Sequence, residues 1–143
     1  MKAMLTQMVR FWVRAIAVAA IATGAHAQKP KEAWEYLKEP AFKSAYMKAL
    51  GPKANTAWLA KRDGPAPEDK FVQVAGERYV KNAFCKNRDC GDNSAVILYS
   101  PDKKSVYGTI YEKGKTTLIG DPPPAVAAEL GQLWKKEWRS QPQ

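Results

Sequence analysis

The chain has 143 residues, with 23 Lys and Arg against 14 Asp and Glu, a formal net charge of +9, two cysteines and one histidine. This length suits one domain of ordinary size. Two cysteines without a nearby histidine cannot supply the four ligands that zinc prefers, so we expect no metal site.

Residues 1–27 have the features of an export signal. Three cations stand near their start: Lys2, Arg10 and Arg14. An apolar run follows over 15–22, too short to stay in a bilayer as a spanning helix, and Ala25-His26-Ala27 is a small-x-small cleavage site. We therefore expect a removed signal peptide over 1–27, a single domain over 28–143, a periplasmic location and no membrane span.

Loss of the signal removes three cations and the only histidine, which leaves a net charge of about +6. Without histidine, general acid–base chemistry would have to use carboxylates, lysine or cysteine, and triads are excluded. Asp89 and Asp92 are close in sequence, but Asp92 precedes Asn93 and is more typical of a turn. We predict no enzymatic activity, no catalytic residue and no cofactor.

Apolar positions recur every three or four residues over 31–50, which predicts two short helices or one helix broken at Pro40. Gly51-Pro52 is a stop signal. The stretch 61–70 is a loop by composition, and its charges alternate in sign, which favours a solvated surface over nucleic-acid binding.

Five strands are predicted by short runs rich in Val, Ile, Tyr and Phe, at 71–74, 78–84, 95–99, 106–111 and 115–119. Their connections are too short for crossover helices, so neighbouring strands should be antiparallel. Residues 125–138 return to helical spacing, with cations at the carboxyl end. No nucleic-acid motif accompanies those charges. The fold class predicted is α+β.

The only cysteines enclose Cys85-Lys86-Asn87-Arg88-Asp89-Cys90, between the second and third strands. An oxidising compartment favours a disulfide here, and so short a ring would stabilise the fold by roughly 2 kcal/mol. The spacing differs from the thioredoxin-type redox motif. The pair is either a structural staple at a strand end or a device that preorganises Lys86, Asn87, Arg88 and Asp89 for binding.

An ordered set of motifs resembles the Ivy family of periplasmic inhibitors of vertebrate lysozyme over roughly residues 31–138. The motifs are the cysteine segment followed by Gly91-Asp92-Asn93, Ser100-Pro101-Asp102-Lys103-Lys104, Val106-Tyr107-Gly108, Leu118-Ile119-Gly120-Asp121-Pro122, and Trp58 with Gly64-Pro65-Ala66-Pro67. The resemblance implies a central antiparallel sheet, helices packed on one side, and a protruding disulfide-closed loop.

In inhibiting members of the family, this loop enters the cleft of a chicken-type lysozyme and contacts its two catalytic carboxylates. The family loop usually reads Cys-Lys-Pro-His-Asp-Cys, and here Asn87 replaces the proline and Arg88 the histidine. Arg88 can pair a carboxylate through two hydrogen bonds, but it is longer than histidine. The resemblance thus assigns the target contacts to Lys86, Asn87, Arg88 and Asp89.

Two alternatives stay open. The basic charge would repel a basic chicken-type lysozyme at long range, so another lysozyme type or an endogenous lytic transglycosylase are candidate targets. The same scaffold could also serve as a non-inhibitory module that binds the cell envelope. The family includes dimers, which leaves monomer and homodimer both open.

Overall fold

The computed structural model describes residues 29–140. The expected signal peptide over 1–27 lies outside these residues. No helix between 29 and 140 is both long and apolar enough to cross a membrane.

A five-stranded antiparallel sheet forms the centre of the molecule, with the strands side by side in chain order. The strands are β1 (Lys70–Val74), β2 (Glu77–Cys85), β3 (Asn93–Ser100), β4 (Ser105–Glu112) and β5 (Lys115–Ile119). The predicted meander is therefore confirmed, with strand ends that differ by at most two residues from the expected ones. Ala75-Gly76 and Lys113-Gly114 both have two successive positive φ angles, the conformation of tight type I′ hairpins.

Four α-helices and a 3₁₀ turn complete the fold: α1 (Ala33–Tyr36), α2 (Pro40–Leu50), η1 (Gly51–Asn55), α3 (Ala57–Lys61) and α4 (Pro124–Trp138). Pro40 occupies the first turn of α2, where its missing N–H costs no helical hydrogen bond. It thus separates two helices, one of the two arrangements predicted. Helix α3 was not predicted from the sequence.

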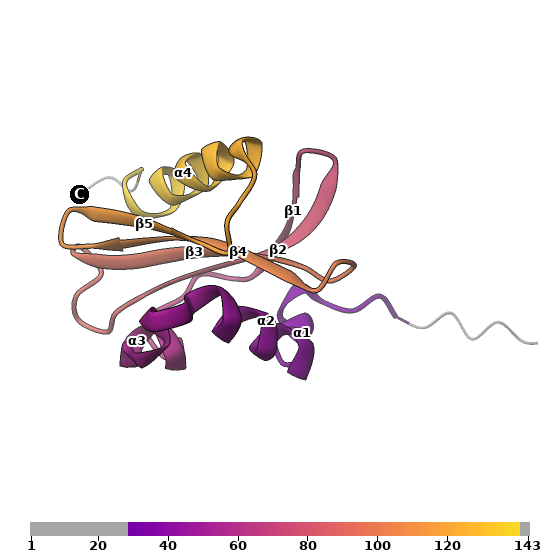
Figure 1. The fold of residues 1–143 in the computed structure, drawn as a ribbon, viewed down its shortest axis with the longest axis horizontal. Helices are drawn as coiled ribbons and strands as arrows, with labels where there is room; N and C mark the ends of the chain where they lie inside the picture. Colours follow the sequence, from indigo (N-terminus) through magenta and orange to yellow (C-terminus); the bar gives the residue numbers. More distant parts are fainter. Residues whose placement is uncertain (1–28, 141–143) are drawn as a thin grey trace, which may run out of the picture.

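The helices cover both faces of the sheet (Figure 1). Helices α1, α2 and α3 lie on one face, and α4 lies on the other. Each face has its own core: Phe42 and Leu59 belong to the first, Val126 and Leu130 to the second. The expectation that the helices pack on one side was therefore wrong for α4, although the α+β class is confirmed.

Strand β3 explains this two-sided arrangement. Every residue from Asn93 to Ser100 is buried, because side chains on both sides of the strand face a helix layer. A continuous apolar run such as Ala95–Tyr99 is typical of a strand covered on both faces, whereas a half-exposed strand alternates. Strand β3 also pairs with β2 as far as Cys85, which lies opposite Ser94.

Candidate functional site: the disulfide-closed loop

The cysteine segment leaves the sheet at the end of β2 as a closed loop. Cys85 and Cys90 form a disulfide with their Cα atoms 4.9 Å apart. The N–H of Asp89 donates to the carbonyl of Lys86 at 3.0 Å, which closes a β-turn. Within this turn only Arg88, at the third position, has a positive φ, of 62°. One positive φ at that position is the pattern of a type II turn.

The side chains at the tip of the loop are free to meet a partner. Lys86, Asn87 and Arg88 are exposed, whereas Asp89 and Cys90 are half-buried. The carboxylate of Asp89 accepts a hydrogen bond of 2.7 Å from the side-chain amide of Asn93. Asp89 therefore holds the loop against β3, while two cations and one amide face outward.

Backbone hydrogen bonds fix the base of the loop to its neighbours. Lys86 N–H donates to the carbonyl of Asn93 at 3.0 Å, and Asn93 N–H returns a bond of 2.9 Å to the carbonyl of Asp89. Lys113 N–H, in the β4–β5 turn, donates to the carbonyl of Asp92 at 2.7 Å. Few backbone groups are thus left to order when a partner binds.

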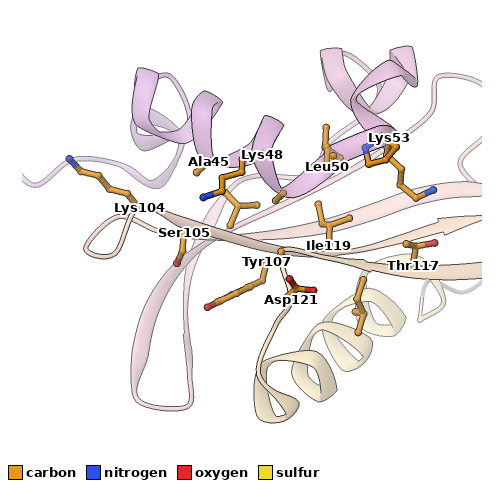
Figure 2. A pocket seen from close by; sticks show the side chains of 16 residues that line it. Ala45, Lys48, Leu50, Lys53, Lys104, Ser105, Tyr107, Thr117, Ile119 and Asp121 are labelled. Carbon is orange, nitrogen blue, oxygen red and sulfur yellow. The ribbon is translucent and has the colours of Figure 1, made fainter.

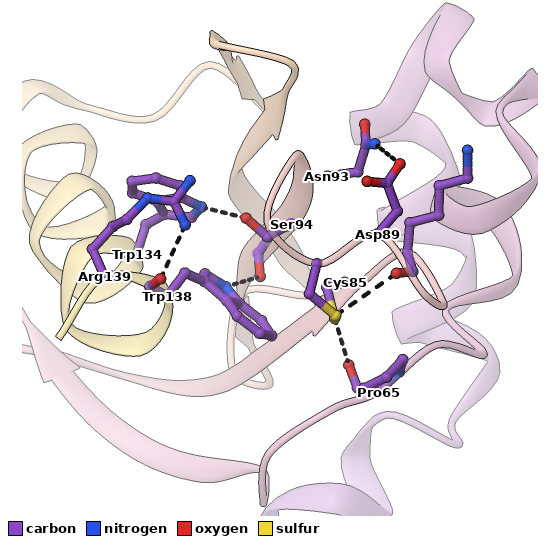
Figure 3. The surroundings of a disulfide bond; sticks show 11 residues. Pro65, Cys85, Asp89, Asn93, Ser94, Trp134, Trp138 and Arg139 are labelled. Carbon is purple, nitrogen blue, oxygen red and sulfur yellow. Dashed lines mark hydrogen bonds between the residues drawn. A yellow bond between two sulfur atoms is a disulfide. The ribbon is translucent and has the colours of Figure 1, made fainter. Parts of the chain in front are cut away.

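The segment that follows α3 contacts the base of the loop at Cys85. Cys85 N–H donates to the carbonyl of Pro65 at 3.1 Å. The Sγ of Cys85 lies 3.6 Å from the same oxygen (Figure 3), a van der Waals contact because a disulfide sulfur carries no proton. A Cβ on Gly64 would stand 1.9 Å from the carbonyl oxygen of Cys85, so only glycine fits there.

A chain of polar side chains ties this supporting segment to β2. The guanidinium of Arg62 donates to the side-chain oxygen of Asn82 at 2.9 Å, and the amide of Asn82 donates to Asp69 at 2.7 Å. Arg62 also lies over the rings of Phe42 and Tyr46, 4.6 and 5.3 Å from their centroids. Burial lowers the pKa of Arg62 below its ordinary value.

Two tryptophans at the end of α4 brace the other side of the loop (Figure 3). The indole N–H of Trp134 donates to the hydroxyl of Ser94 at 2.9 Å, and that of Trp138 donates to the carbonyl of Ala95 at 3.3 Å. Both acceptors lie at the start of β3, directly after the loop. The loop is therefore anchored from both faces of the sheet.

Arg139, just beyond α4, adds a third contact to this side. Its guanidinium donates to the carbonyl of Gly91 at 3.1 Å. It also lies over the rings of Tyr111 and Trp134, 5.0 and 4.6 Å from their centroids. Its charge adds to those of Lys86 and Arg88, so three exposed cations lie at this end of the sheet, beside Asp89 and Asp92.

Residues 29–140 hold no cluster of three or more His, Cys, Asp or Glu side chains that could bind a metal. A hollow of about 790 Å³ lies between α2 and the β4–β5 edge of the sheet. Figure 2 shows Leu50 and Ile119 turned toward each other there, and no residue of the cysteine loop lines it.

The contacts that support the loop were not predicted from the sequence. Arg62, Asn82, Trp134 and Trp138 were assigned no part in the site, because their contacts join residues far apart in the chain. Only Asn82 could have been recognised from the sequence, because it is a polar residue inside a mostly apolar strand. Gly64 and Pro65 belong to the family pattern, and their close contact with Cys85 gives a structural reason for their occurring together with the cysteines.

The fold and the site define a small α+β domain that presents one rigid, cationic, disulfide-closed loop. Over residues 41–141 the chain matches the family model described as "Inhibitor of vertebrate lysozyme (Ivy)", and it belongs to that family. The resemblance predicted from the motifs is thereby confirmed. The family is one of inhibitors.

Two curated relatives are similar over shorter stretches. The "Inhibitor of vertebrate lysozyme" of Pseudomonas aeruginosa is 26% identical over 85 residues, which cover 59% of this chain and 56% of that protein. An uncharacterized protein of Yersinia pestis is 31% identical over 75 residues, which cover 52% of this chain and 49% of that protein. The chain thus spans about half the length of the curated relatives it matches.

Proposed function

We propose that the protein inhibits a lysozyme by inserting its Cys85–Cys90 loop into the active-site cleft. The observation that carries this proposal is the exposure of Lys86, Asn87 and Arg88 on a turn braced from both faces of the sheet, in a chain of an inhibitor family. The target is a chicken-type lysozyme or another peptidoglycan-cleaving glycosidase.

The chemistry of the cleft suits the residues at the tip. Such glycosidases present two carboxyl groups, one as general acid and one as nucleophile or stabiliser. The guanidinium of Arg88 can donate to both oxygens of one carboxylate in a bidentate pair, and Lys86 can approach the second carboxylate as a point charge. Asp89 stays bound to Asn93 and keeps the turn in shape. No covalent bond forms or breaks, so the protein acts as a plug and not as an enzyme.

The place of action in this proposal is the periplasm. Residues 1–27 direct export and are removed, and the oxidising compartment maintains the disulfide. An inhibitor there meets a lysozyme before it reaches peptidoglycan.

A second candidate function rests on the loop sequence. Asn87 and Arg88 stand where the family usually has proline and histidine, and a cleft shaped for histidine could exclude the longer arginine. On this alternative the protein binds the cell envelope without inhibiting, or inhibits an endogenous lytic transglycosylase. Cosedimentation with purified peptidoglycan in the absence of any lysozyme inhibition would favour the first of these, and inhibition of a purified transglycosylase the second.

The test of the proposal is an inhibition titration with the Arg88→Ala variant. Loss of a charge-assisted bidentate pair should raise the inhibition constant at least about tenfold. Arg78→Ala serves as a matched control, because Arg78 is also exposed and lies near the start of β2, at the opposite end from the loop. Equal inhibition by the parent protein and Arg88→Ala would rule out the role given to Arg88.

A further inference from the structure

A smaller hollow, of about 420 Å³, opens on the helical face of the molecule, away from the cysteine loop. It lies between the α1–α2 connection, α2 and the end of α3. Leu37 and Met47 contribute apolar lining, and the buried Phe42 and Tyr46 also border it. Its size falls within the range of small-molecule sites.

The charges around this hollow are strongly unbalanced. Four cations line it, namely Lys38, Lys43, Lys61 and Arg62, against the single carboxylate of Glu39. Glu39 is already paired with Lys31. Lys38, Lys43 and Lys61 are exposed, and none of them forms a salt bridge within residues 29–140.

Arg62 gives the hollow a partly buried cation with donors to spare. One guanidinium nitrogen donates to Asn82, and its other N–H groups donate to no group in the described part of the chain. A buried charge that lacks a direct counterion is costly. An anion in the hollow would supply that counterion and would meet the three lysines as well.

The larger hollow at the sheet edge is less unbalanced. Lys48, Lys53 and Lys104 line it together with Asp121, and Lys53 is paired with Glu112 at 2.5 Å. The excess of cations is thus greater at the smaller hollow, and charge complementarity favours an anion there.

We propose that the hollow between α1, α2 and α3 binds a phosphate monoester that carries an apolar substituent. A phosphate presents two charges and several acceptor oxygens to the guanidinium and the lysines, more than a carboxylate can. The substituent would lie against Leu37 and Met47. The proposal does not depend on lysozyme inhibition, although Arg62 also ties the segment that supports the loop to β2.

Nuclear magnetic resonance titration of the full chain with phenyl phosphate tests the site. The Nε–H signal of Arg62 and the amides of α2 should shift together and saturate. The Lys43→Ala/Lys61→Ala double variant should bind at least roughly tenfold more weakly, since two charge-assisted contacts are lost. Both side chains are exposed, so the variant should fold as the parent does.

The Lys104→Ala/Lys115→Ala double variant removes the same charge from exposed positions outside this hollow and should bind phenyl phosphate as the parent does. Inorganic phosphate should bind several-fold more weakly, because it gains nothing from the apolar walls. No saturable shift at roughly 10 mM phenyl phosphate, which would place the affinity beyond the millimolar range, contradicts the site. If both double variants bound phenyl phosphate equally weakly, general charge attraction would explain the binding and the specific site would be contradicted. If inorganic phosphate bound as tightly as phenyl phosphate, the proposed contact of an apolar substituent with the hollow would be contradicted.

Discussion

Arg88 combines two properties that act in opposite directions. Its side chain supplies the permanent charge at the tip of the loop, but its backbone has a φ of 62°. A non-glycine residue in that left-handed conformation costs roughly 1–2 kcal/mol. The disulfide, the turn hydrogen bond and the Asp89–Asn93 contact maintain this conformation. The loop therefore holds a charged side chain in a backbone geometry that favours glycine.

The neighbouring position allows a simple test of loop rigidity. Asn87 occupies the second position of the turn, where proline is favoured, and its N–H donates to no group between residues 29 and 140. Asn87→Pro should raise the free energy of unfolding by about 0.4–1 kcal/mol, because the unfolded chain loses freedom. Inhibition should be as strong or stronger, as measured by denaturant unfolding and an inhibition titration. A destabilised variant would show that the turn differs from the one described.

A second residue-scale prediction concerns pH. Glu77 accepts hydrogen bonds from Ser100 at 2.6 Å, Lys103 at 2.9 Å and Tyr79 at 3.1 Å. The Ser100 bond and then the Lys103 bond hold the pKa of Glu77 below its ordinary value of 4.5. A carboxyl group whose pKa is lowered by folding stabilises the folded state at pH values above its ordinary pKa. This stabilisation is lost as the pH falls through the pKa that the group has in the folded protein.

Glu77→Gln should therefore lower the free energy of unfolding at neutral pH by about 0.5–1 kcal/mol, since part of the group meets solvent. The difference from the parent protein should shrink as the pH falls below 4.5. Denaturant unfolding across this range measures it. Glu68→Gln is the control, because Glu68 is exposed and forms no salt bridge in the described chain. A constant difference at all pH values would exclude ionisation of Glu77 as the cause.

At the scale of elements, the site depends on the close approach of two backbones. Gly64→Ala should displace the supporting segment from Cys85, because the added Cβ would stand 1.9 Å from a backbone oxygen. Overpacking of this kind costs about 1–3 kcal/mol. Inhibition should weaken as well, although Gly64 is not part of the tip. Unfolding and inhibition are measured on the same preparation.

Gly91→Ala is the matched control, since a Cβ there would meet no atom within 4 Å. Its stability should stay within about 0.5 kcal/mol of the parent. If Gly64→Ala inhibited as well as Gly91→Ala, the 62–69 segment would have no part in positioning the loop.

The elements that could be predicted from the sequence are those with a local signal. Short runs rich in Val, Ile, Tyr and Phe predicted all five strands, and Pro40 marked the break between α1 and α2. Helix α3 was missed because Ala57–Lys61 is too short for a helical period to emerge. The side on which α4 packs depends on the long-range geometry of the sheet, which no local pattern in 125–138 specifies.

In the site, too, the features with a local sequence signal could be predicted and the long-range contacts could not. The two cysteines and the charges between them were evident in the sequence, as was the family pattern. The contacts of Arg62 with Asn82 and of Trp134 with Ser94 join residues far apart in the chain, so no local spacing predicts them. The partners of the loop could be found only once the fold had brought them together.

At the scale of the whole molecule, one end of the sheet carries the loop and the two helix layers hold it from opposite faces. The cationic character of this end, with Lys86, Arg88 and Arg139, suits an acidic cleft. A basic target would still repel the protein as a whole, and screening at physiological salt confines that repulsion to about 8 Å. Short-range contacts inside the cleft should therefore determine affinity.

The most direct measurement is a double-mutant cycle between Arg88 and a catalytic carboxylate of a chicken-type lysozyme, with affinities from calorimetry. Arg88→Ala is combined with replacement of that carboxylic acid by its amide. A contact between the two groups predicts a coupling energy of at least about 1.5 kcal/mol, as is measured for close charge pairs at interfaces. A tight complex with a coupling near zero would show that the protein binds the lysozyme without Arg88 entering its catalytic centre.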